Sequence, residues 1–230
     1  MIKNKSKPLA LLFLVLFFAS FSHAQSYTKG KRLTYKGRSY STVVMGNGQK
    51  WMAENLRVFY FRNGDPIPVV KTYEAWLEAR ENKQPACCYY ANNAKYGKTY
   101  GLLYNWYAVT DPRGLAPKGW HVPSDKEWTI LMDHIGGKPT AGTKMKSTSG
   151  WKDGGERGKG TNESGFSGLP GGLRIIIGMF LDVGSFGCWW SSTENSRQSA
   201  WCRSLGYNSG DAYRRDYYKA VGLSVRCLRD

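Results

Sequence analysis

Basic and aromatic side chains that could hold a ligand gather in the C-terminal part of the chain. A guanidinium group pairs with carboxylate, phosphate or sulfate groups, and an exposed tyrosine offers an apolar ring with a polar tip. Side chains alternate between the two faces of a strand, so about half of them would point outward. The candidate binding residues are Arg203, Tyr207, Tyr213, Arg214, Arg215 and Tyr217. A structural role, with the tyrosines covering sheet edges, is an equally open interpretation.

Oxygen-bearing side chains in the middle of the chain could bind Ca²⁺, which prefers carboxylate and amide oxygens. They are Asp153, Glu156, Asn162 and Glu163. Solvated loop polarity is the simpler and favoured interpretation, so we expect no metal and no other cofactor. His121 and His134 have no second ligand in a matching pattern, so structural or exposed roles are favoured for both.

Five cysteines could form disulfides or act as thiols: Cys87, Cys88, Cys188, Cys202 and Cys227. Their number is odd, so at most two internal bridges can form and one thiol remains. Their spacing leaves the connectivity open. No CxxC pair occurs, and no histidine adjoins a cysteine in the sequence. Structural cysteines are therefore favoured over catalytic ones.

The first 24 residues have the pattern of a secretory signal peptide. They open with three lysines, continue with a 13-residue apolar run and end in small residues. A transmembrane anchor is the alternative, but the run is shorter than the roughly 20 residues that span a bilayer. We expect cleavage between Ala24 and Gln25. The mature protein would then be secreted, periplasmic or at the cell surface, with no membrane span.

The charge of the chain must be judged on the mature protein. The full 230 residues have 33 Lys and Arg against 17 Asp and Glu, a formal charge of +16. Loss of the leader removes three lysines and no acid, which leaves +13 on 206 residues. An exported basic protein meets anionic glycans and envelope polymers rather than nucleic acid. The expected partners are such a polymer, a glycan or a protein, and nucleic acid is not expected.

Local patterns predict the elements that must position these side chains. Residues 25–34 are a flexible lead-in, and the domain itself spans 35–230. A hairpin turns at Lys36-Gly37, and a further strand follows at 49–52. Helices are predicted over 72–80, 100–109 and 124–135, the last opened by a capping box of Ser124 and Glu127.

The second half of the chain is predicted to hold loops and antiparallel strands. Residues 137–168 are rich in Gly, Ser, Thr and Lys and are expected to be irregular. Together with the C-terminal strands, this loop is the expected binding face. A buried strand is predicted over 173–177. The closing strands are predicted over 188–192, 200–207, 212–218 and 223–228. The expected fold is α+β, with two main helices, antiparallel strands, long irregular loops, and N- and C-terminal strands in one sheet.

Six sequence blocks, in order, resemble the Fibrobacter succinogenes major paralogous domain family. They are QKWMAENL (49–56), YGLLYNWYAV (100–109), GWHVPS with Glu127 and Trp128 (119–128), GFSGLPGG (165–172), WWSSTE (189–194) and GLSVRC (222–227). The resemblance covers about residues 35–230. It implies a secreted or surface-exposed bacterial protein with a C-type-lectin-like fold, distantly related to formylglycine-generating enzymes. It implies no enzymatic activity.

The resemblance also implies a disulfide framework. Cys88 and Cys227 look like the recurring cysteines of the family, so we infer a Cys88–Cys227 bridge. Cys188 and Cys202 lie on adjacent predicted strands and could form a second bridge, which leaves Cys87 as the odd thiol.

Two functions known for related folds find little support in the residues. Ca²⁺-dependent lectins carry a Trp-Asn-Asp motif that this chain lacks. Formylglycine-generating enzymes need two reactive late cysteines, and the residues around Cys202 and Cys227 do not match theirs. We therefore expect a non-catalytic, exported, C-type-lectin-like module that binds a glycan, an envelope polymer or a protein. The alternatives are an oxidoreductase related to formylglycine-generating enzymes and a purely structural envelope protein.

Overall fold

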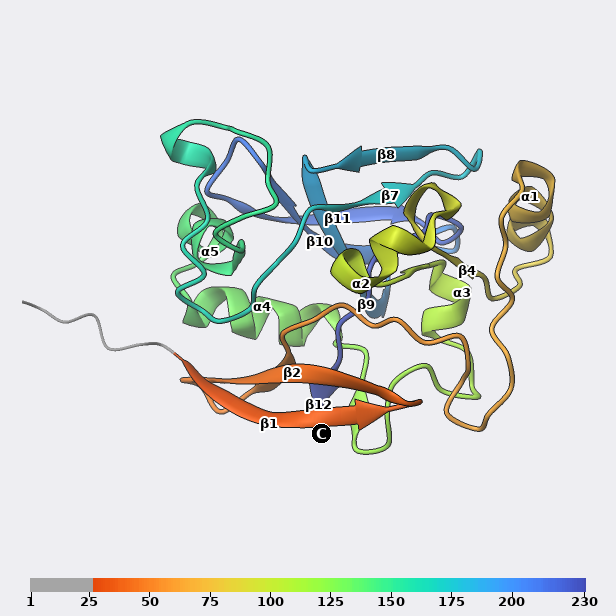
Figure 1. Ribbon diagram of the computed structural model, residues 1–230, viewed down its shortest axis with the longest axis horizontal. Coiled ribbons are helices and arrows are strands. Elements are labelled where there is room, and N and C mark those ends of the chain that lie inside the picture. The colour runs from red at the N-terminus through yellow and green to blue at the C-terminus, as the bar shows by residue number, and fades with distance from the viewer. Residues whose placement is uncertain (1–26) are drawn as a thin grey trace, which may run out of the picture.

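A computed structural model describes residues 27–230 of the chain. The fold mixes a few helices with several small antiparallel sheets (Figure 1). The predicted signal peptide lies outside the described residues. Between residues 27 and 230, no helix is both long and apolar enough to cross a membrane.

The largest sheet joins the two ends of the described chain. Its strands run in the order β1-β2-β3-β12-β6. Their bounds are β1 Tyr27–Tyr35, β2 Arg38–Met45, β3 Lys50–Met52, β12 Leu228–Arg229 and β6 Trp120–His121. Leu228 pairs with Trp51 on one side and with His121 on the other. The prediction that N- and C-terminal strands share a sheet is confirmed.

The expected flexible lead-in over 25–34 needs correction, because residues 27–34 belong to β1. The β1–β2 hairpin turns at Lys36-Gly37 as predicted and continues to the pair Tyr27↔Met45. A register shift between Gly30 and Leu33 interrupts it. The side chains of β1 are mostly exposed. Backbone pairing with β2 therefore orders a polar segment that side-chain patterning alone marks as loop.

The second sheet contains the predicted C-terminal strands in the order β11-β10-β9. The strands are β9 Phe186–Glu194, β10 Ser199–Gly206 and β11 Ala212–Tyr218, and β11 forms the edge. Two smaller sheets pair β4 Cys87–Cys88 with β5 Leu103–Tyr104, and β7 Gly171–Arg174 with β8 Phe180–Val183. The predicted last strand is shorter than expected, since only β12 forms within residues 223–229.

Capping residues begin the two longest helices where the sequence predicts. In α4 Asp125–His134, the Ser124 hydroxyl accepts from the Glu127 amide, and Glu127 accepts from the Ser124 amide. In α1 Tyr73–Glu81, Thr72 accepts from the Ala75 amide. Short helical turns are η1 Tyr90–Asn92, η2 Ala94–Tyr96 and η3 Glu156–Gly158.

The single helix predicted over 100–109 is wrong. The chain forms α2 Gly97–Tyr100, then strand β5, then α3 Trp106–Val109. Gly101 ends α2 with a φ of 76°, which a side chain would strain. Asn105 then caps α3 by accepting from the Ala108 amide at 3.1 Å. The helical spacing of apolar residues here reflects burial on every side rather than one helix.

A helix within the expected irregular region was not predicted. Helix α5 spans Lys138–Met145 and packs against β11. Its Gly and Thr content lowers its helix propensity, which conceals it in the sequence. Gly142 is required, because a Cβ there would lie 2.2 Å from the Asp211 carbonyl oxygen.

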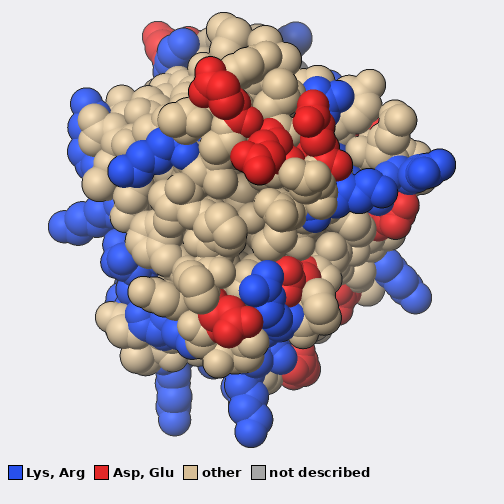
Figure 2. All heavy atoms as spheres, turned by 90° about the vertical axis from the view of Figure 1, so that its right-hand side faces the viewer, with Lys and Arg blue, Asp and Glu red and all other residues tan. Residues whose placement is uncertain are grey.

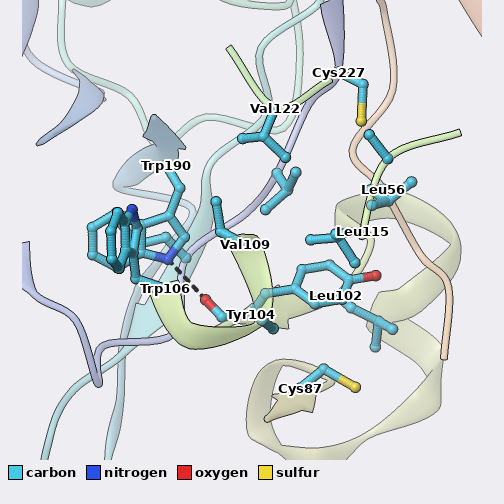
Figure 3. Packing of buried hydrophobic residues seen from close by; sticks show 14 of the residues in the cluster. Leu56, Cys87, Leu102, Tyr104, Trp106, Val109, Leu115, Val122, Trp190 and Cys227 are labelled. Atoms are coloured by element: carbon cyan, nitrogen blue, oxygen red, sulfur yellow. Dashed lines mark hydrogen bonds between the residues drawn. The ribbon is translucent and has the colours of Figure 1, made fainter. Parts of the chain in front are cut away.

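Buried aromatic residues hold the sheets and helices together. The predicted core tryptophans are all buried: Trp51, Trp106, Trp120, Trp128, Trp189 and Trp190. One cluster packs around Tyr104 and Trp190, whose indole N–H donates to the Tyr104 carbonyl at 2.8 Å (Figure 3). A second cluster lies around Trp51, Trp128 and Phe166, whose rings are within about 6 Å of one another.

Candidate functional site

Arg203 was expected to contribute to a binding face, but the structure buries it. Only 1% of Arg203 is exposed. Its guanidinium donates to the Asp125 carboxylate at 2.6 Å, to the Asp125 carbonyl at 2.9 Å and to the Thr129 hydroxyl at 2.9 Å. Strand alternation turns this side chain under α4. Arg203 therefore fastens the start of α4 to the sheet and is not available to a surface ligand.

Arg214 lies beside Arg203 on the neighbouring strand and shares its partner. Its Nε is 3.0 Å from both carboxylate oxygens of Asp125, and its guanidinium stacks 3.3 Å from the Trp201 ring centre. Burial raises the pKa of Asp125, but hydrogen bonds from Arg214 and Arg203 outweigh it and hold that pKa below its usual value. The charge of Arg214 is already matched by a carboxylate.

The remaining predicted residues do not join Arg203 and Arg214. Tyr213, Arg215 and Tyr217 alternate with Arg214 along β11, so they face the other side of the sheet. Arg215 lies 5.0 Å from the Tyr213 ring, and Tyr217 is half-buried against the core. Tyr207 follows β10, and its carbonyl packs against Gly154 and Gly158. The six residues thus form no single binding face.

Three of the four oxygen-bearing side chains considered for Ca²⁺ have partners within the chain. Asp153 accepts from the Gly155 amide, Glu156 pairs with Lys159, and Asn162 bonds Ser167. Among residues 27–230, no three His, Cys, Asp or Glu side chains gather in a way that could hold a metal.

A buried lysine ties these loops together. The Lys146 ammonium donates to the carbonyls of Gly158 at 2.5 Å, Ser209 at 2.7 Å and Gly206 at 3.1 Å. Burial lowers its pKa to about 8. The carbonyl oxygens that converge here are therefore satisfied by a protein cation.

All five cysteines are buried free thiols, and neither inferred disulfide is present. Cys88 packs in the cluster around Trp76, whereas Cys227 belongs to the main cluster. Figure 3 shows Cys87 and Cys227 at opposite ends of the labelled side chains. Cys188 is directly opposite Ser204 rather than Cys202, so the two thiols are offset along the strands. Burial raises the pKa of each thiol, which disfavours the reactive thiolate.

The described surface has an elongated concave site where several distant segments meet. Two hollows of about 340 and 400 Å³ adjoin, because both are lined by Ser41, Ala53 and Ser167. The segments are β2, the loop after β3 and the chain leading into β7, together with β1, which carries Lys29 and Arg32, and α2, which carries Lys98. They lie close together near the middle of Figure 1. We call this site the motif groove, since residues of QKWMAENL and GFSGLPGG line it.

The motif groove is positively charged and rich in hydroxyl groups. Its cations are Lys29, Arg32, Arg57 and Lys98. Among its described lining residues only Glu54 is acidic, and this carboxylate accepts from the Ser41 amide at 2.7 Å and pairs with Arg32 at 3.8 Å. The Nε of Arg57 is buried without a hydrogen-bond partner. A groove lined by four cations and one carboxylate is suited to an anionic ligand.

A buried arginine beneath the groove fixes its floor. Arg226 donates to Asn55 Oδ1 at 2.9 Å, to the Ser167 carbonyl at 2.9 Å and to the Phe166 carbonyl. Trp189 donates to the same Asn55 oxygen at 2.8 Å. Burial lowers the pKa of Arg226 to about 9, partly offset by Glu54. This network joins residues from four of the six sequence blocks.

Two residues on the groove wall have a left-handed backbone. Asn162 and Ser167 have φ values of 54° and 55°. A hydrogen bond links the two residues, since Asn162 Oδ1 accepts from the Ser167 amide at 2.7 Å. Left-handed non-glycine residues cluster at functional sites because surrounding contacts must maintain them.

Sequence reasoning placed the binding face at the C-terminal strands and the 137–168 loop. Ser147, Asn162 and Ser167 of that loop do line the groove, but its cations were not predicted. Its lining cations are scattered along the chain, so no local basic run identifies them. One feature of the sequence could have indicated the groove. The family blocks 49–56 and 165–172 contain Gly, Ser, Asn and Glu residues that the hydrophobic pattern does not assign to the core. Their meeting point depends on long-range pairing that the sequence does not reveal.

No curated protein and no solved structure matches this sequence. The family model described as the Fibrobacter succinogenes major domain matches residues 44–229. That match covers most of the chain and contains the blocks that meet in the motif groove and in the network beneath it. The chain therefore belongs to the Fibrobacter succinogenes major domain family.

Proposed function

We propose that the protein is an exported, non-catalytic, C-type-lectin-like module whose motif groove binds an anionic glycan or envelope polymer. The observation that carries this proposal is the groove itself, which joins two hollows and carries four cations against one engaged carboxylate. A linear polymer could contact both hollows in sequence. Hydroxyl and amide groups along the groove would pair with sugar hydroxyls.

The buried thiols favour binding over the redox alternative. An enzyme of the formylglycine-generating type needs accessible reactive cysteines, whereas Cys202 and Cys227 are both fully buried. Their raised pKa values keep them protonated. A purely structural envelope role would not require a cationic groove with an unpaired Arg57 donor.

The test measures binding of the full mature chain to uronic-acid and sulfated polysaccharides, with uncharged dextran as reference and with EDTA in parallel. The double variant Lys29→Gln/Lys98→Gln removes two exposed cations that have no partner in the described chain. We expect an affinity about fivefold lower at low salt, with the difference shrinking as salt screens the charges. EDTA should have no effect.

A matched control separates the groove from net charge. The double variant Lys118→Gln/Lys126→Gln removes the same charge from exposed positions outside the motif groove and should bind as the unaltered protein does. Arg215→Ala tests the C-terminal strands. Equal losses of affinity in both double variants would show that net charge, and not the motif groove, determines binding. A larger loss of affinity in Arg215→Ala would place the binding site on β11 instead.

A further inference from the structure

A second concave site differs from the motif groove in both chemistry and position. It is a hollow of about 410 Å³, a size typical of small-ligand sites. Its lining is mainly aromatic and aliphatic: Phe59, Tyr60, Pro66, Ile67, Val69, Lys71, Tyr89, Asn92 and Ala94. Lys71 is its only charged lining residue. We call it the aromatic pocket.

The aromatic walls are rigid and form a corner. The Phe59 and Tyr89 rings lie 5.6 Å apart at an interplanar angle of 81°. The Tyr89 ring packs closely against Gly97, where a Cβ would lie only 2.2 Å from the ring. Tyr60 and Val69 remain 49% and 45% exposed. Large apolar side chains that are exposed together beside a hollow indicate a binding site.

Asn92 gives this apolar pocket an unsatisfied acceptor. Its amide nitrogen donates to the Lys71 carbonyl at 2.7 Å, which fixes the orientation of the amide group. Its Oδ1 is buried and has no partner among the described residues. A buried acceptor without a donor costs free energy unless a ligand supplies one. An unpaired acceptor on a lining residue favours a ligand that donates a hydrogen bond.

The backbone at this position is strained. Ala91 and Asn92 both have a left-handed conformation, with φ values of 51° and 53°. Two consecutive left-handed residues other than glycine are unusual and strained. This conformation turns the chain between η1 and η2 beside the aromatic corner. The geometry is maintained at a cost, as expected of a ligand-binding position.

The lining of the aromatic pocket favours an uncharged ligand, because Lys71 is its only charged residue. Figure 2 shows the side of the molecule that carries α1 and the chain leading into it. A broad area without charged side chains lies there between an upper acidic group and a lower mixed group. A pyranose ring combines an apolar C–H face, which stacks on aromatic rings, with hydroxyl donors at its rim. We propose that the aromatic pocket binds an uncharged hexose or pentose unit, with a sugar hydroxyl donating to Asn92 Oδ1.

The test probes the mature chain with an array of uncharged oligosaccharides of glucose, mannose, galactose and xylose, followed by calorimetric titration of the bound ones. Tyr60→Ala removes an exposed stacking ring. Asn92→Gly removes the acceptor but keeps a residue that adopts positive φ without strain. We expect each change to weaken binding about tenfold, equivalent to about 1.4 kcal/mol. Raising the salt concentration should leave the affinity unchanged.

Tyr73→Ala is the matched control, since Tyr73 is also 49% exposed and lies outside the pocket. It should bind as the unaltered protein does. The assignment is wrong if no uncharged oligosaccharide binds at millimolar concentration, or if either pocket variant retains full affinity. It is also wrong if Lys29→Gln/Lys98→Gln abolishes this binding, because the sugar would then occupy the motif groove.

Discussion

At the scale of single residues, two arginines stabilise the fold from buried positions. One of them, Arg203, was expected to be exposed and to bind a ligand. Arg203 and Arg226 are both fully buried, and each donates to backbone carbonyls of a distant segment. Only a planar guanidinium reaches several such oxygens at once. Sequence alone could not separate these arginines from exposed Arg215, because all three lie in segments predicted to be strands, and the pattern does not show which face is covered.

Replacing Arg226 by lysine should destabilise the fold by about 2–3 kcal/mol. Lysine keeps the charge but lacks the planar guanidinium group with its several N–H donors. The Phe166 and Ser167 carbonyls and Asn55 Oδ1 therefore cannot all receive a hydrogen bond. Urea unfolding of the mature chain measures the change. Arg229→Lys, at an exposed position three residues further along the chain, should unfold as the unaltered protein does. Equal free energies of unfolding for both variants would contradict the role assigned to Arg226.

At the scale of elements, local signals were predictable and packing-dependent ones were not. The capping box that begins α4 is readable because Ser124 and Glu127 are three residues apart and satisfy each other. Helix α5 escaped detection because its glycine serves a contact with Asp211, which lies far along the chain. The break at Gly101 was likewise set by long-range pairing of β5 with β4.

His121 should make the junction between β6, α4 and the last strand sensitive to pH. Its two ring nitrogens contact Glu127 at 2.8 Å and Asp230 at 2.6 Å. Burial lowers the pKa of His121, but the two carboxylates raise that pKa by more than burial lowers it. The net shift is therefore upward from 6.5. The protonated form is therefore favoured by folding. Its contribution is complete below about pH 6.5 and disappears as the pH rises through the raised pKa.

The variant His121→Gln isolates this contribution. Between pH 5.5 and 8, the free energy of unfolding of the unaltered protein should fall relative to that of the variant. Equilibrium urea unfolding at four pH values across this interval gives the difference. A difference that stays constant, or grows with pH, would show that the two carboxylates do not stabilise the charged imidazole.

At the scale of the whole molecule, the family blocks converge although they are spread over most of the chain. The network of Asn55, Trp189 and Arg226 brings their residues together beneath the motif groove. The α+β class and the joined chain ends were predictable from the order of strands and helices. The site was not, because its cations come from separate segments. The same long-range packing decides the state of the cysteines.

The structure predicts that the folded chain carries five free thiols rather than two disulfides. Each thiol is buried, and burial raises its pKa, so a water-soluble thiol reagent at pH 7.5 should label none of them within minutes. After unfolding in guanidinium without reductant, five thiols per chain should react. The inferred Cys88–Cys227 and Cys188–Cys202 bridges would leave only one. As a control, residues 25–230 are produced both in a reducing cytoplasm and in an oxidising periplasm. Equal numbers of free thiols in the two preparations would show that packing of the chain, and not the redox state of the compartment, keeps the sulfurs apart.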